Sequence, residues 1–116
     1  MGRLMMDFER GDIYLVNFNP AKGGEIGKLR PAIILSDRDA NAVLETVIVI
    51  PLSTIIEADT LPFRYTISQR AKLQKESDAC INEVRALSKT RLKEKLAEVT
   101  VEELNVIQNA LCQITC

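Results

Sequence analysis

The stretch Thr46-Val47-Ile48-Val49-Ile50 is the strongest strand signal in the sequence, because β-branched side chains favour the extended backbone of a sheet. It runs into Pro51, a residue that strands accept mainly at their edges and ends. Two hydroxyl side chains, Ser53 and Thr54, follow soon after. The pattern therefore predicts a β-strand with a pair of hydroxyl groups at its C-terminal end.

Four other strand patterns lie on either side of this stretch, at residues 13–18, 32–35, 63–67 and, more weakly, 79–84. In the first of them the alternation places Tyr14, Val16 and Phe18 on one face. A chain of 116 residues has the length of one domain. We therefore expect a single domain over residues 1–116, of class α+β and mainly β, folded as a small antiparallel barrel or curled sheet.

The C-terminal part of the sequence predicts an amphipathic helix. Thr100 and Glu103 have the spacing of a capping box, in which each side chain binds a free backbone N–H at the start of a helix. An apolar face follows at helical spacing, formed by Val101, Leu104, Ile107, Leu111 and Ile114. Residues 89–98 are rich in Lys and Glu and suit either a second short helix or turn or a solvated connector. Residues 37–41 are predicted to form a polar turn.

Composition limits the chemistry available to the chain. Hydrophobic residues make up 47% and charged residues 27%, as in an average globular protein. Fifteen basic and 16 acidic residues give a net charge of -1, so a nucleic-acid partner requires a local basic patch. The sequence contains no histidine, which excludes every mechanism that uses an imidazole as acid, base or metal ligand.

The three cysteines, Cys80, Cys112 and Cys116, have no C-x-x-C spacing. This pattern favours neither a disulfide framework nor a zinc site. We expect the cysteines to be small buried hydrophobic residues, in a protein of the reducing cytoplasm. The longest apolar stretch, residues 42–52, is interrupted by Glu45 and falls short of the roughly 18 residues that a membrane span needs. A cytoplasmic protein without metal, cofactor or membrane partner is expected.

A basic segment without acidic residues covers residues 61–75. Its cations include Arg64, Arg70 and Lys72, and two aromatic residues lie among them. Such a mixture suits the backbone and bases of single-stranded RNA. A solvated basic stretch between strands accounts for the same residues equally well.

A second candidate site begins in a glycine-rich loop at residues 21–29, which carries Lys22, Glu25 and Lys28. Arg30 follows at the start of the next predicted strand. The planar guanidinium of arginine offers paired, charge-assisted hydrogen bonds that fit a phosphate.

The hydroxyls of Ser53 and Thr54 would add donors for a phosphoryl oxygen, and Glu25 would add a carboxylate. From the residues alone a plainer interpretation also stands. Arg30 would then be a surface ion-pair partner of Glu25, and Ser53-Thr54 a turn after the strand.

Several segments occur in a recognisable order along the chain. They are Gly11-Asp12-Ile13-Tyr14-Leu15-Val16, Asn19-Pro20, Gly23-Gly24-Glu25-Ile26-Gly27-Lys28-Leu29-Arg30-Pro31-Ala32-Ile33-Ile34-Leu35-Ser36, Val47-Ile48-Val49-Ile50-Pro51-Leu52-Ser53-Thr54, Val84-Arg85-Ala86-Leu87-Ser88-Lys89 and Arg91-Leu92. In this order they resemble the MazF/PemK toxin family, whose members are ribosome-independent endoribonucleases of toxin–antitoxin modules. The resemblance covers nearly the whole chain.

This resemblance implies an SH3-like barrel of the CcdB/MazF type with a C-terminal helix, assembled as a homodimer. It implies that Arg30 is the catalytic arginine, that Ser53 replaces a catalytic threonine, and that Glu25 is an acidic loop residue involved in activity. The chain departs from the family at Asn82, where many members have Asp, and at Cys80, where one branch has Arg. No acid or cation is therefore carried over to those two positions.

The resemblance also implies a function. We expect a metal-independent endoribonuclease that cuts single-stranded RNA by attack of the ribose 2′-hydroxyl, with Arg30, Ser53, Thr54 and Glu25 as catalytic residues. The expected partners are an antitoxin and RNA, with DNA reached only through the antitoxin. Two alternatives remain open at this point: a CcdB-like toxin that binds DNA gyrase without catalysis, although the chain lacks Trp, and an SH3-like peptide-binding module.

Overall fold

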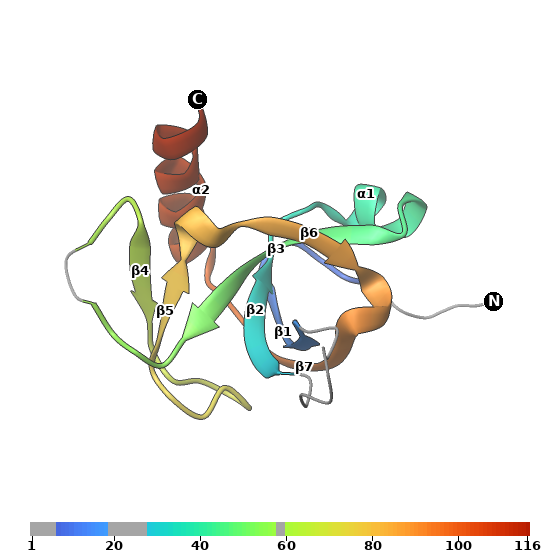
Figure 1. The fold of residues 1–116 in the computed structure, drawn as a ribbon, viewed down its shortest axis with the longest axis horizontal. Coiled ribbons are helices and arrows are strands. Elements are labelled where there is room, and N and C mark those ends of the chain that lie inside the picture. Colours follow the sequence, from blue (N-terminus) through green and yellow to red (C-terminus); the bar gives the residue numbers. More distant parts are fainter. Residues whose placement is uncertain (1–6, 19–27, 58–59) are drawn as a thin grey trace, which may run out of the picture.

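The computed structural model describes residues 7–18, 28–57 and 60–116. Over these residues the chain forms a single curled sheet of seven strands with a helix against one face (Figure 1). The strands are β1 (Asp12–Asn17), β2 (Leu29–Ile34), β3 (Thr46–Ser53), β4 (Arg64–Ile67), β5 (Ser77–Cys80), β6 (Arg85–Ser88) and β7 (Leu92–Glu98). The helices are α1 (Arg38–Val43) and α2 (Val101–Thr115), with 3-10 turns η2 (Ile81–Glu83) and η3 (Lys89–Arg91).

Strand β3 lies at the centre of the sheet. The strand order is β4-β5-β3-β2-β1-β7, and β6 pairs with the first half of β3, on the edge where β5 pairs with its end. All of these pairings are antiparallel. On that edge the pairing with β6 ends at Val49 and the pairing with β5 begins at Leu52. Pro51, which has no N–H to donate, lies in the gap between them and therefore breaks no hydrogen bond with β6 or β5. The strand predicted from residues 46–50 is thus confirmed and continues to Ser53.

The sheet separates two apolar clusters, as expected when side chains alternate across strands. One cluster lies between the sheet and α2 and contains Ile13, Ile33, Ile50, Leu52, Ile107 and Ala110 among others. The other lies inside the curl of the sheet and contains Val16, Ala32, Ile34, Val47, Val49 and Leu92 among others. Tyr14 and Phe18 pack against this second cluster with Val16, so the predicted common face of residues 14, 16 and 18 is confirmed.

Three expectations from the sequence were wrong in whole or in part. The short helix or turn expected after Ser88 is confirmed by η3, which Ser88 caps, but residues 92–98 form strand β7 and not a solvated connector, because the backbone of β7 pairs with β1 along its length. Residues 37–41 belong mostly to α1, which Asp37 caps by accepting a hydrogen bond from the Ala40 N–H at 2.8 Å. The weak strand at 79–84 ends at Cys80 and is followed by η2.

The capping box of α2 is confirmed, with both reciprocal hydrogen bonds between Thr100 and Glu103 formed. The predicted apolar face holds only in the middle of the helix. Ile107 is fully buried, whereas Val101 at the start is 73% exposed. The helix packs against the sheet through its central turns, where Ala110 contacts the same apolar cluster as Ile107.

The cysteines differ in their surroundings. Cys80 is buried, as expected, but Cys112 on the last turn of α2 and Cys116 directly after it are exposed, with their sulfur atoms 2.6 Å apart. The expectation that all three are buried hydrophobic residues was therefore wrong for two of them. Among the described residues, no helix has the length and apolar character needed to cross a membrane.

The packing of α2 gives a first prediction. Ile107→Ala should lower the free energy of unfolding by about 2–5 kcal/mol, because it removes buried methyl groups and leaves a cavity. Val101→Ala, on the same helix but exposed, should change it by less than about 0.5 kcal/mol. Urea denaturation of both variants measures the difference, and equal losses would contradict the described contact of α2 with the sheet.

Candidate active site

Arg30 and Ser53 share one face of the sheet. The register of β2 and β3 pairs Ala32 with Pro51, so two residues further along, Arg30 comes level with Ser53. Since alternate side chains point to the same side of a strand, both side chains belong to the face that also carries Ala32 and Pro51. Two residues 23 positions apart in the sequence thus meet at one end of the β2–β3 pair.

A shallow cavity of about 390 Å³ lies on this face. Its lining residues are Phe18, Lys28, Arg30, Pro51, Glu83 and Arg85. Three cations and a single carboxylate therefore surround one opening, an arrangement that favours an anionic ligand. The guanidinium carbon of Arg85 lies 5.6 Å from the centre of the Phe18 ring, within cation–π distance.

Arg85 was not among the site residues expected from the sequence. It lies 55 positions after Arg30 and reaches the cavity because β6 pairs with β3, with Arg85 opposite Val49. The basic segment considered at residues 61–75 does not include it. Only the pairing of β6 with β3, which the sequence did not predict, could have identified it.

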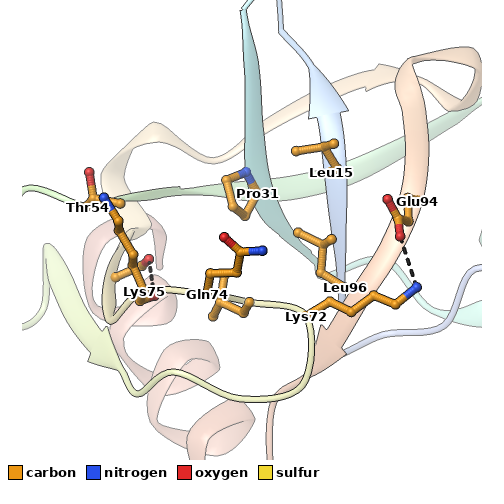
Figure 2. A pocket seen from close by; sticks show the side chains of 10 residues that line it. Leu15, Pro31, Thr54, Lys72, Gln74, Lys75, Glu94 and Leu96 are labelled. Carbon is orange, nitrogen blue, oxygen red and sulfur yellow. Dashed lines mark hydrogen bonds and ion pairs between the residues drawn. The ribbon is translucent and has the colours of Figure 1, made fainter.

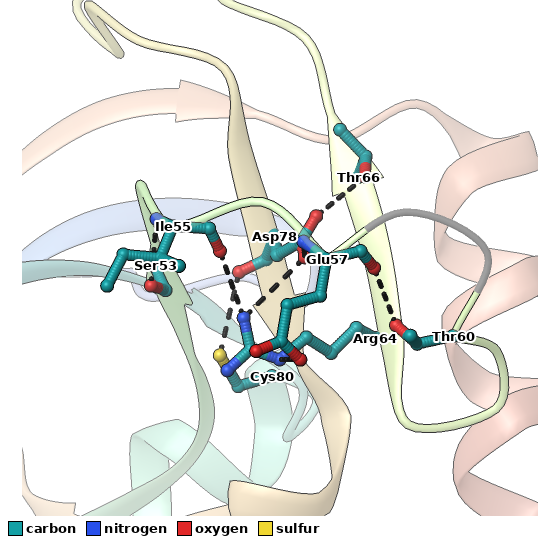
Figure 3. Close-up of polar contacts among 8 residues, drawn as sticks. All are labelled: Ser53, Ile55, Glu57, Thr60, Arg64, Thr66, Asp78 and Cys80. Carbon is teal, nitrogen blue, oxygen red and sulfur yellow. Dashed lines mark hydrogen bonds and ion pairs between the residues drawn. The ribbon is translucent and has the colours of Figure 1, made fainter.

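The hydroxyl of Ser53 has a defined orientation. Its oxygen accepts a hydrogen bond from the Ile55 N–H at 3.1 Å, within the turn that follows β3 (Figure 3). A serine hydroxyl that accepts in this way keeps its own proton for another acceptor. Ser53 can therefore donate to an oxygen atom bound near Arg30.

Thr54 lies elsewhere. It lines a different cavity of about 370 Å³, together with Pro31, Lys72, Gln74 and Lys75 (Figure 2). Pro31 belongs to the face of β2 opposite to that of Arg30. The structure therefore brings Ser53, and not Thr54, to the side of the sheet that carries Arg30.

A profile described as PemK-like, MazF-like toxin of type II toxin-antitoxin system matches residues 9–115. The chain belongs to this toxin family.

Individual relatives agree with the family. The protein named Endoribonuclease MazF from Staphylococcus saprophyticus is 34% identical over 103 residues, which cover 88% of this chain and 86% of the relative. The crystal structure of MazF from Deinococcus radiodurans is 26% identical, with a TM-score of 0.72 over 91% of this chain and 94% of that one. A MazE–MazF structure from the same organism has a TM-score of 0.78 at 24% identity, over 95% and 96% of the chains, which supports the fold.

The other residues expected to bind RNA do not all lie at the Arg30 cavity. Lys28 lines the Arg30 cavity. Arg64 contacts the Ile55 carbonyl at 3.0 Å and two carboxylates, described below. Lys72 forms an ion pair with Glu94 at 3.0 Å. Lys22 and Glu25 lie outside the described residues.

Arg70 is held by α2. Its guanidinium forms paired hydrogen bonds with the two carboxylate oxygens of Glu103, one of them 2.7 Å long, and a further bond to the Ser68 hydroxyl at 2.9 Å. The hydrogen bond from Arg70 lowers the pKa of Glu103 and raises the pKa of Arg70. This cation thus joins the segment after β4 to the start of α2.

Cys80 lies on β5 opposite Arg64 of β4. Burial raises the pKa of its thiol, while the positive charges of Arg64 and Arg30 oppose that change. The thiol therefore stays protonated at neutral pH and is a poor nucleophile. In the described part of the chain, no three Cys, Asp or Glu side chains gather as a metal site.

The Arg70–Glu103 pair gives a second prediction. Because the folded pKa of Glu103 is lowered, its contribution to stability is complete above the ordinary value of 4.5 and is lost as the pH falls below it. Glu103→Gln should lower the free energy of unfolding at neutral pH by about 2 kcal/mol and flatten its decline in acid. Glutamine keeps an acceptor for the Thr100 N–H, so the helix cap is preserved.

Urea denaturation over a series of pH values measures this effect. Glu94→Gln is the matched control, since it removes the more exposed ion pair with Lys72 and should change stability much less. The same acid dependence in Glu103→Gln and wild type would show that the Arg70 pair does not stabilise the fold.

Proposed function

We propose that this chain is a metal-independent endoribonuclease that cleaves single-stranded RNA at a short sequence motif. Membership of the toxin family and the name of the relative, Endoribonuclease MazF, support this activity. The observation that carries the proposal is the common face of Arg30 and Ser53 beside a cavity lined by Lys28 and Arg85. Such a site fits the phosphate of a nucleic-acid backbone.

In the proposed reaction the RNA supplies its own nucleophile. The ribose 2′-hydroxyl loses its proton and bonds to the adjacent phosphorus, while the bond from phosphorus to the 5′-oxygen breaks and that oxygen takes up a proton. The products are a 2′,3′-cyclic phosphate and a 5′-hydroxyl. The protein needs only to orient the phosphate, stabilise its developing charge and assist the two proton transfers.

Arg30 would bind the phosphoryl oxygens through its planar fork, and Ser53 would donate its hydroxyl proton to one of them. Arg85 and Lys28 would hold the flanking phosphates. Two carboxylates are candidates for the base that takes the 2′-proton. One is Glu25, which precedes β2 in the sequence, and the other is Glu83, which lines the Arg30 cavity.

We also propose a cytoplasmic homodimer that an antitoxin keeps inactive. Solved structures with similar folds include a MazE–MazF complex and an endoribonuclease bound to its cognate antitoxin. Leu35, Ile48 and Leu111 line an open apolar cavity of about 390 Å³ between the sheet and α2, which suits contact with a second copy. The cations around Arg30 suit acidic residues of an antitoxin, which would cover the RNA site.

The role of Arg30 gives a third prediction. Arg30→Ala should lower the rate of RNA cleavage by several orders of magnitude, and Arg30→Lys should recover little, because a point charge does not reproduce the paired hydrogen bonds of the fork. An RNA oligonucleotide with one 2′-deoxy sugar on the 5′ side of the scissile phosphate should bind and remain uncut. EDTA should leave the rate unchanged.

These measurements use a long unstructured transcript to locate the cleavage motif, then an oligonucleotide containing it. Cleavage of the 2′-deoxy substrate would contradict the role of the 2′-hydroxyl. Loss of activity in EDTA with recovery in magnesium would contradict the metal-independent reaction. A rate for Arg30→Ala close to wild type would remove Arg30 from the site.

The separation of the two hydroxyls gives a fourth prediction. Ser53→Ala should lower kcat by about 10²-fold through loss of one donor to the transition state. Thr54→Ala should have a small effect, since Thr54 lines the cavity on the Pro31 side. The kinetics of the two variants on the same oligonucleotide decide between the hydroxyls, and a larger loss in Thr54→Ala would reverse the assignment.

A further inference from the structure

Asp78 is a buried acid that the reaction described above does not use. It lies on β5 opposite Ser53 of β3, and its side chain is 0% exposed. A buried carboxylate is destabilising unless its oxygens are hydrogen-bonded or paired with a cation. Replacement of such a group by an apolar one of similar volume is often neutral for stability. Packing alone therefore does not explain a carboxylate at this position.

The partners of Asp78 come from the segment after Ser53 and from β4 (Figure 3). The Glu57 N–H donates to one carboxylate oxygen at 2.7 Å, and the Thr66 hydroxyl donates to the other at 2.6 Å. The guanidinium of Arg64 lies 3.6 Å from the oxygen that also binds Glu57. The same carboxylate therefore fixes the backbone four residues beyond Ser53.

Arg64 holds the same turn at a second point. Its guanidinium donates to the Ile55 carbonyl at 3.0 Å and lies 3.5 Å from the Glu57 carboxylate. The Arg64 side chain is 19% exposed and that of Asp78 is fully buried, whereas the Glu57 side chain is 57% exposed. Residue Ile55 also donates its N–H to the Ser53 hydroxyl. The turn that orients Ser53 is thus held by Asp78 at the Glu57 N–H and by Arg64 at the Ile55 carbonyl.

We propose that Asp78 and Arg64 are positioning residues, which keep the Ser53 hydroxyl aimed at the phosphate site by fixing the turn over residues 53–57. This inference rests on the proposed function of Ser53. It assigns Arg64 a role inside the protein rather than in contact with RNA. The two roles differ in their kinetics, because a phosphate contact acts mainly on KM and the placement of a catalytic donor acts on kcat.

The test compares Asp78→Asn with Asp12→Asn. Asp12 is also a buried acid, with a hydrogen bond from the Glu9 N–H at 3.1 Å and a lysine partner at 3.3 Å, but it lies at the opposite end of the β1–β2 pair from Arg30. In Asp78→Asn an NH2 group replaces one of the two carboxylate oxygens. That group cannot accept the hydrogen bond from the Glu57 N–H or from the Thr66 hydroxyl, so the turn should loosen. We expect kcat to fall by about 10²-fold with KM nearly unchanged, and Asp12→Asn to keep the wild-type kcat.

Arg64→Met keeps the aliphatic part of the side chain and removes the guanidinium. It should lower kcat with little change in KM, and the double variant with Asp78→Asn should lose no more than the worse single variant, since both act on one turn. A rise in KM alone for Arg64→Met would show that Arg64 contacts RNA. A kcat for Asp78→Asn equal to that of Asp12→Asn would overturn the proposal for Asp78.

Amide hydrogen exchange tests the positioning without RNA. Exchange at Ile55 should accelerate in Asp78→Asn and in Arg64→Met while that of Val49, in the middle of β3, stays as in wild type. Unchanged exchange at Ile55 would overturn the proposal even if activity fell. If the wild-type protein cut no RNA, the proposed function would fail, and the exchange measurement would still decide whether these residues hold the turn.

Discussion

The pairing of β2 with β3 through Ala32 and Pro51 determines which side chains of the site meet. Because the side-chain period of a strand is two, this register puts Arg30 and Ser53 on one face and leaves Thr54 to the cavity beside Pro31. A shift of β3 by one residue would exchange the two hydroxyls. The pairing of β6 with β3 adds Arg85, and the end of β1 adds Phe18, so the cavity depends on two further strands, one paired with β2 and one with β3.

Charge is distributed unevenly over a chain whose net charge is only -1. Three cations after β3 contact acids of the same chain, namely Arg64 with Asp78 and Glu57, Arg70 with Glu103, and Lys72 with Glu94. The Arg30 cavity instead has three cations and one carboxylate in its lining. The first group strengthens the fold, and the second provides the local positive potential that a phosphate backbone requires.

Much of the fold could be predicted from local sequence patterns. The β-branched run of β3, the alternation of β1 and the capping box of α2 each depend on neighbouring residues, and all three were confirmed. Strand β7 was not predicted, because its Lys and Glu residues favour a helix locally and only pairing with β1 selects the extended form. Tertiary pairing outweighs intrinsic preference in such a segment.

The site likewise contains residues that the sequence could predict and residues that only the fold could identify. Arg30 and Ser53 could be proposed from their residue types and their resemblance to a family, but the choice between Ser53 and Thr54 required the register of β3. Arg85 required the pairing of β6, and the internal partners of Arg64 required the fold of the whole β3–β4–β5 region. Long-range contacts of this kind leave no signal at a fixed spacing in a single sequence.

A crystal structure of the protein with an RNA oligonucleotide that carries a 2′-deoxy sugar at the cleavage position tests the central claim most directly. We expect the scissile phosphate on the β2–β3 face, within hydrogen-bond distance of both the Arg30 guanidinium and the Ser53 hydroxyl. A scissile phosphate bound instead in the cavity of Thr54 and Lys72, on the other side of the sheet, would contradict it.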